Sequence, residues 1–200
     1  MKNEFTKTPY SLLWDEVGIQ TLLFYHLRNS MRGCVDTSLV IPEYSPKVPE
    51  NAKCTLHQDV MQKYAGKEWN GKIDLCIVEF GEDVLNLFKN PKKYNNCSFW
   101  CFEPRPVIAM EIKFTWKNEI VNHIKHDIKK LYKMIEDWGT ELVYLCLVTD
   151  IENERDYTDF LSLVKDKIVD HREKFRIAVG TWYDNPETSE LWKIEKVVDR

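Results

Sequence analysis

Two charged residues interrupt the hydrophobic stretch VIAMEIKF, which spans residues 107–114. Its apolar residues predict a strand buried on both faces. In a strand, Glu111 and Lys113 point to the same side because they are two positions apart. Burying an unpaired charge costs several kcal/mol or more. A carboxylate and an ammonium on one face of a core strand therefore indicate bound metal and phosphate chemistry, unless they form a surface ion pair on a half-exposed edge strand.

A third charge, Asp74, lies in the preceding predicted strand, GKIDLCIVEF, over residues 71–80. Both faces of this strand are mostly apolar, which favours a central position in the sheet. Asp74 near its start would then be a second carboxylate in a buried setting. The alternative is an Asp that caps the turn formed with Gly71 and Lys72.

The first predicted helix adds a further carboxylate. Its apolar stripe consists of Leu12, Ile19, Leu23 and Leu27, at 100° per residue. Glu16 falls at the centre of this stripe, whereas the adjacent Asp15 falls outside it. Glu16 is therefore expected to face the core, unless the register is wrong or the side chain bonds to nearby backbone.

Carboxylates that share a low-dielectric site cannot all ionise cheaply without a cation. Mg²⁺ or Mn²⁺ would satisfy them, because hard divalent ions prefer oxygen ligands. Such an ion can lower the pKa of a bound water and stabilise charge on a phosphoryl oxygen. A lysine beside it can orient that water or neutralise the developing charge. The combination indicates hydrolysis of phosphodiester bonds.

Asp74 followed by Glu111-Ile112-Lys113 on the next strand resembles the PD-(D/E)XK nuclease superfamily, also called restriction-endonuclease-like. The resemblance implies an αβββαβ core in which Asp74, Glu111 and the main-chain carbonyl of Ile112 bind the metal. Lys113 would activate or position the water. Many members carry a Glu on the first helix, which Glu16 matches, and it would support the metal directly or through water.

The remaining patterns fit one α/β domain over residues 1–200, with a mixed central sheet flanked by helices. The nuclease-like core spans about 10–150. An insertion loop is expected at about 81–106, and a C-terminal helix with additional strands at about 151–200. Helices are predicted at 9–29, 56–66, 118–138 and 154–171, and strands within 34–51 and at 71–80, 107–114, 141–150, 175–183 and 191–198.

Four lysines are candidates for nucleic-acid contact. Lys92 and Lys93 lie among aromatic residues in the insertion, which suits single-stranded or distorted nucleic acid. Lys125 and Lys129 lie off the apolar stripe of the helix at 118–138, where they could contact phosphates. An ordinary insertion and a solvated helix face are the alternatives. His123 and His126 lack the further ligands that zinc requires.

The bulk composition limits partners and compartment. The formal net charge of −4 means that a nucleic-acid partner needs a local basic face. No membrane span or signal-peptide core is expected. Six cysteines without a CxxC pair indicate a reducing, cytoplasmic compartment, with Cys76 and Cys146 as core residues.

The first hypothesis is a Mg²⁺- or Mn²⁺-dependent endonuclease, rather than exonuclease, acting on DNA. Specificity would come from loops, a homodimer or a partner protein, since no separate DNA-reading domain is visible. The alternative is a catalytically inactive nuclease-fold module for nucleic-acid binding or assembly. A third class is a structural protein with a buried ion-pair network. Three carboxylates and one lysine argue against it, because such a network would keep an excess of negative charge.

Overall fold

The computed structural model describes residues 16–31, 38–45, 71–80, 105–114, 120–149, 151, 154–181 and 192–197. The elements within them are, in chain order, α2 (Glu16–Ser30), β1 (Ser38–Tyr44), β2 (Ile73–Glu79), β3 (Arg105–Phe114), α5 (Ile120–Trp138), β4 (Leu142–Thr149), α6 (Glu154–Lys165), the 3-10 helix η4 (Arg172–Lys174), β5 (Phe175–Thr181) and β6 (Trp192–Lys196). Because the described residues form both helices and strands, the structure confirms the predicted α/β class.

The six strands form one mixed sheet in the order β1-β2-β3-β4-β5-β6. β1, β2 and β3 pair antiparallel, whereas β3, β4 and β5 pair parallel. The parallel connections run through α5 and α6, as parallel strands require. β6 pairs antiparallel with β5 and closes the far edge, so the additional C-terminal strands are present. β3 is thus central, at the junction of the antiparallel and parallel halves.

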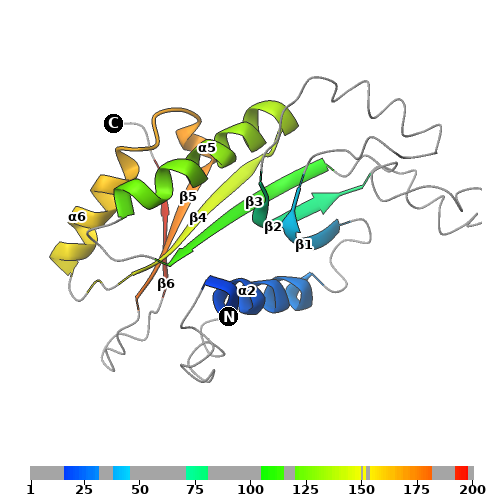
Figure 1. Cartoon of the computed structure of the whole chain (residues 1–200), viewed down its shortest axis with the longest axis horizontal. Coiled ribbons are helices and arrows are strands. Elements are labelled where there is room, and N and C mark those ends of the chain that lie inside the picture. The colour runs from blue at the N-terminus through cyan, green and yellow to red at the C-terminus, as the bar shows by residue number, and fades with distance from the viewer. Residues whose placement is uncertain are drawn as a thin grey trace, which may run out of the picture.

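Helices cover both faces of the sheet, as predicted (Figure 1). α2 lies against one face, where Ile19 packs with residues of β2 and β3 such as Leu75 and Ile112. α5 and α6 lie on the opposite face, and their apolar residues form the larger core with β4 and β5. α2 on one face and α5 with α6 on the other therefore exclude water from the middle of β3 on both sides.

The apolar stripe of α5 follows its predicted spacing. Ile124, Ile128 and Leu131 are buried against the sheet, at steps of three and four residues. The helix ends at Gly139, whose φ of +70° allows the left-handed turn that reverses the chain. Its N–H bonds back to the carbonyl of Ile135. This stop directs the chain straight into β4.

The prediction that the next helix extends to 171 is wrong, because α6 ends at Lys165. The N–H groups of Lys167 and Ile168 bond to carbonyls three residues earlier, which tightens the last turn. This turn brings Ile168 into the core with 0% exposure and leads the chain to β5. Burial of one apolar side chain thus outweighs continuation of the helix.

Some predicted elements lie outside the described residues: the helix at 56–66, the start of the first helix with Leu12 and Asp15, and the insertion from 81 to 104. The short strand expected within 34–51 is present as β1. Cys76 and Cys146 are free and buried, as predicted, and burial raises the pKa of both thiols. None of the helices within the described ranges is long and apolar enough to cross a membrane.

Candidate active site

Pairing of β2 with β3 brings Asp74 to the Glu111-Ile112-Lys113 segment. Leu75 lies opposite Met110 in the antiparallel register, so the residue before Leu75 is level with the residues after Met110. The backbone N–H of Ile112 donates a 2.7 Å hydrogen bond to Asp74 Oδ2. Asp74 therefore bridges two neighbouring strands instead of serving only the turn that precedes β2.

Glu111 is buried in the centre of the site, with 1% of its surface exposed. Its neighbour is Lys130 of α5, whose Nζ lies 2.6 Å from Glu111 Oε1. This short contact between opposite charges acts on the titration of both groups. The alternative of a surface pair between Glu111 and Lys113 on an edge strand is therefore wrong, because β3 is central and Glu111 pairs with another lysine.

Lys113 contacts two carboxylates from different helices. Its Nζ lies 3.1 and 3.3 Å from the two carboxylate oxygens of Glu16, and 3.8 Å from Asp127 Oδ2. Glu16 is the first residue of α2 and keeps 39% of its side chain exposed. It lies on the sheet-facing side, as predicted, but at the half-open end of the helix and not deep in the core.

Two residues of α5 complete the cluster, and the sequence pattern assigns neither of them to the site. By helical position alone, Asp127 is a rim or capping residue and Lys130 is one of several surface lysines. In the structure Asp127 is buried, with no hydrogen-bond partner at Oδ2. Lys130 lies 3.4 Å from Asp127 Oδ1 and donates to the carbonyl of Lys72 at 3.2 Å. One feature of the sequence could have linked Asp127 and Lys130 to the site. They are three positions apart, which places both on the same flank of the apolar stripe that contains Ile124 and Ile128.

The cluster of Glu16, Asp74, Glu111, Asp127, Lys113 and Lys130 is called the carboxylate–lysine cluster below. It contains four carboxyl groups and two ammonium groups, an excess of two negative charges when all are ionised. Two lysines of the same chain therefore do not neutralise it.

Burial is the largest influence on the pKa values of Glu111 and Asp74. Burial, reinforced by the charge of Asp74, raises the pKa of Glu111 to about 9. Burial also raises the pKa of Asp74, although the N–H of Ile112 opposes this. The raised pKa of Glu111 means that a proton and a cation compete for this carboxyl group.

Both lysines are held in their charged form. Burial alone would lower the pKa of Lys113, but Asp127 and Glu16 outweigh burial and the pKa is raised. The same balance raises the pKa of Lys130, where Glu111 and then Asp127 supply the opposing charge. Each ammonium is therefore a fixed positive charge at working pH.

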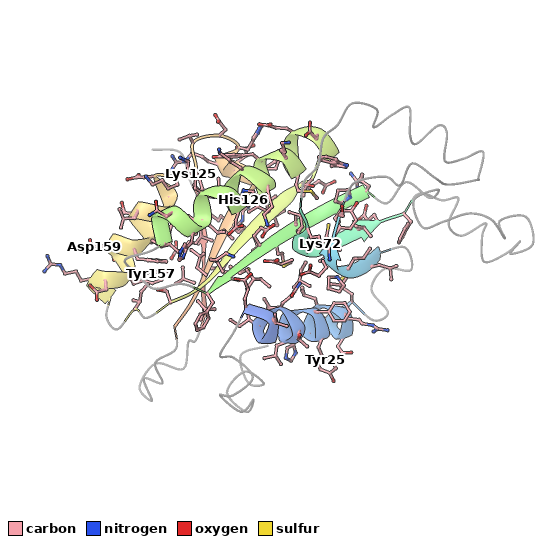
Figure 2. All side chains as sticks on the ribbon, viewed as in Figure 1. Tyr25, Lys72, Lys125, His126, Tyr157 and Asp159 are labelled. Atoms are coloured by element: carbon pink, nitrogen blue, oxygen red, sulfur yellow. The ribbon has the colours of Figure 1, made fainter. Side chains whose placement is uncertain are left out.

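A hydrogen-bond network from α2 supports the main chain at Asp74. Gln20 Nε2 donates to the carbonyl of Asp74 at 2.6 Å and to Glu43 Oε1 at 3.1 Å. Lys72 Nζ lies 3.3 Å from Glu43 Oε2. Figure 2 places Lys72 beside the start of β2. The network joins α2, β1 and β2 at the end of the sheet that carries the site.

The oxygen donors of the cluster suit Mg²⁺ or Mn²⁺ in type. Glu111 supplies a buried carboxylate, and Asp74 lies on the neighbouring strand, bonded to the N–H of Ile112. Within the described ranges, no group of three or more His, Cys, Asp or Glu side chains is arranged around one metal position. An ion would therefore rest on Asp74, Glu111 and non-side-chain oxygens, with waters filling its shell. The role of the Ile112 carbonyl stays a prediction.

The predicted nucleic-acid lysines divide into two groups. Lys125 and Lys129 line a cavity of about 300 Å³ together with Tyr132 and Lys167, which follows α6. Figure 2 shows Lys125 on α5. Lys129 is exposed whereas the adjacent Lys130 is largely buried, so the cavity and the carboxylate–lysine cluster use different flanks of the helix. Lys92 and Lys93 lie outside the described residues.

Comparison of the chain with protein-family models, curated proteins and solved structures gave no match. The assignment of function therefore depends on the residues of the site and their geometry.

Proposed function

We propose that the protein is a Mg²⁺- or Mn²⁺-dependent nuclease of the restriction-endonuclease-like type that hydrolyses phosphodiester bonds in DNA. The observation that carries this proposal is the hydrogen bond from Ile112 N–H to Asp74 Oδ2, which places Asp74 beside a buried Glu111. The proximity of these residues supports the arrangement of two carboxylates and Lys113 that the PD-(D/E)XK resemblance implies.

The order of elements supports the same proposal. α2, β1, β2, β3, α5 and β4 follow one another as helix, three strands, helix and strand. Among the described residues, this succession is compatible with the αβββαβ order of the proposed fold, in which β2 and β3 would carry the site. β5 and β6 extend the sheet beyond this core.

In the proposed reaction, Asp74 and Glu111 hold the divalent ion, and Glu16 supports it through water or through Lys113. The ion supplies a water of lowered pKa and an electrophile for the phosphoryl oxygen. Lys113, held between Glu16 and Asp127, orients the attacking water or stabilises the negative charge that develops on the phosphoryl oxygens. Burial of Glu111 keeps the local dielectric low, so each of these contacts is stronger than in water.

DNA would reach the site with its phosphates guided by lysines outside the cluster. The cavity lined by Lys125, Lys129 and Lys167 supports such contacts on a protein whose net charge is negative. Sequence specificity would come from loops, a homodimer or a partner protein. Two buried free cysteines fit action in a reducing, cytoplasmic compartment.

A second candidate is a nuclease-like module without activity, in which the charges only stabilise the fold. The 2.6 Å contact between Lys130 and Glu111 favours it, because this ion pair neutralises the most buried carboxylate. The two candidates differ in turnover, and a purely structural network also differs in metal binding.

The deciding experiment incubates the purified protein with circular single-stranded DNA, supercoiled double-stranded DNA and RNA, each with Mg²⁺, Mn²⁺ or EDTA. We expect metal-dependent nicking of a circular DNA, since an exonuclease cannot begin on a circle. The matched control is Asp74→Asn, prepared in parallel to exclude a contaminating nuclease. Metal binding without cleavage of any substrate would favour the inactive module.

A further inference from the structure

The Lys130 ammonium occupies the most negative part of the carboxylate–lysine cluster. It lies 2.6 Å from Glu111 Oε1 and 3.4 Å from Asp127 Oδ1, and the charge of Asp74 also acts on it. Only 14% of its side chain is exposed. A cation is thus already present at Glu111, one of the two proposed metal ligands, and it belongs to the protein.

Lys130 does not supply hydrogen bonds to all the oxygens of these carboxylates. Asp127 Oδ2 is buried without a hydrogen bond, and the nearest ammonium, that of Lys113, lies 3.8 Å from it. A buried carboxylate oxygen that lacks a hydrogen bond retains much of its desolvation cost. The site is therefore held in a state that a better cation would improve.

We propose that Lys130 is an internal counter-cation that holds Glu111 in the metal-free protein and gives up this contact when a divalent ion binds at Asp74 and Glu111. This inference rests on the proposed function and adds the step by which the site is loaded. A divalent ion bound at Glu111 would lie close to an ammonium that is 2.6 Å from Oε1, and the two like charges repel at that range.

The surroundings of Lys130 allow this exchange. Its hydrogen bond to the Lys72 carbonyl and its contact with Asp127 remain available after it leaves Glu111. Its stem passes Gly71, where a Cβ would meet Lys130 Cδ at 4.0 Å. A lysine has a flexible four-carbon stem, so the ammonium can move without a change in the helix.

The exchange has a consequence for metal affinity. Each divalent ion must displace a resident positive charge, so Lys130 lowers the affinity of the wild type. In return, Lys130 stabilises the metal-free fold by compensating Glu111 and Asp127. Lys113 lacks this role, because its contacts are Glu16 and Asp127 and not Glu111.

The test is the pair Lys130→Met and Lys133→Met, since Lys133 lies on the same helix but is exposed. Mn²⁺ binding is measured by titration calorimetry, and the melting temperature is measured with EDTA and with Mn²⁺. We expect Lys130→Met to bind Mn²⁺ roughly tenfold more tightly or better, because one competing charge is removed. Its metal-free melting temperature should fall and recover with Mn²⁺, whereas Lys133→Met should match the wild type.

A second measurement needs only the wild type and therefore does not depend on the fold of a variant. Acetylation of lysine amines by a succinimidyl ester is followed by mass spectrometry, with Lys133 as the internal reference. We expect Lys130 to react slowly with EDTA and faster with Mn²⁺, because release from Glu111 exposes the amine.

The outcomes separate the two proposals. If the wild type binds Mn²⁺ while Lys130→Met binds no more tightly and Lys130 reactivity is unchanged, the counter-cation role is overturned and the nuclease proposal stands. If neither protein binds Mn²⁺ at millimolar concentration, the metal-dependent function fails, and this inference fails with it. Binding by Lys130→Met alone would support the counter-cation role.

Discussion

The backbone N–H of Ile112 donates a 2.7 Å hydrogen bond to Asp74 Oδ2, joining two residues 38 positions apart in the chain. The bond fixes the carboxylate of Asp74 against the strand that carries Glu111 and Lys113. A side-chain oxygen that accepts from a strand N–H is tied to a rigid element, which limits its movement. Asp74 is therefore pre-positioned, and only its second oxygen is left for other partners.

The substitution Asp74→Asn should remove the negative charge of Asp74 while keeping its hydrogen bond from the Ile112 N–H. The amide oxygen can still accept from Ile112 N–H, so the fold should survive, while the loss of charge should weaken Mn²⁺ binding at least about tenfold. Removal of a buried like charge beside Glu111 should leave the metal-free melting temperature equal or higher. Calorimetry and thermal unfolding in EDTA check both statements. A variant that binds Mn²⁺ like the wild type would show that Asp74 is not a ligand.

Lys113→Ala should lower DNA cleavage about a hundredfold or more while Mn²⁺ binding persists, because Lys113 acts on water or on the transition-state charge and does not ligate the ion. Glu111→Ala should lose both metal and cleavage. The measurements are plasmid nicking rates and calorimetry, each with a melting temperature to verify folding, since loss of one partner from a buried cluster is destabilising. Cleavage by Lys113→Ala at the wild-type rate would reduce its pair with Glu16 to a structural contact.

Stability of the metal-free protein should fall as pH rises. The pKa of Glu111 is raised from 4.5 to about 9, so in this range the native state binds a proton that the unfolded chain releases. The free energy of unfolding therefore decreases with pH through that window. The raised pKa of Asp74 acts in the same direction.

The measurement for this pH dependence is the melting temperature in EDTA between about pH 6 and about pH 9. Glu111→Gln, which cannot ionise, should show a flatter profile than the wild type. Mn²⁺ should bind more tightly as pH rises, because it competes with that proton. Identical slopes for the wild type and Glu111→Gln would mean that Glu111 does not titrate in this range.

The lysine-lined cavity predicts a salt-dependent contribution to DNA binding. Lys125→Glu with Lys129→Glu, in a Glu111→Gln background to prevent cleavage, should weaken binding. The slope of log affinity against log salt should fall by about 0.9 for each phosphate that is no longer neutralised. Lys167→Glu should act similarly, because Lys167 lines the same cavity. Fluorescence anisotropy measures the slope. The control is Lys196→Gln, an exposed lysine of β6, and an equal effect there would indicate only nonspecific attraction.

Strand periodicity was sufficient to predict that Glu111 and Lys113 share a face, because alternation fixes which side chains point the same way. That Asp74 lies beside them depends on the register of β2 against β3, and the family resemblance, not the periodicity, suggested it. The partners of these residues were not predictable in the same way. A helical stripe gives the buried side of α5, but which flank meets β3 depends on how the helix crosses the sheet. In the sequence Asp127 and Lys130 therefore resemble ordinary flanking residues, and only the packing assigns them to Glu111 and Lys113.

Because β3 joins the antiparallel and parallel halves of the sheet, the site can assemble in two stages during folding. The Asp74–Ile112 bond needs only β2 and β3, which pair as neighbours in sequence order. The contacts of Lys130 need a separate step, in which α5 docks on β3 and the crossover pairs β4 with β3. A chain that has formed only the first stage holds its carboxylates together with no lysine from α5 to compensate them. Docking of the crossover is thus the folding event that supplies the compensating charge.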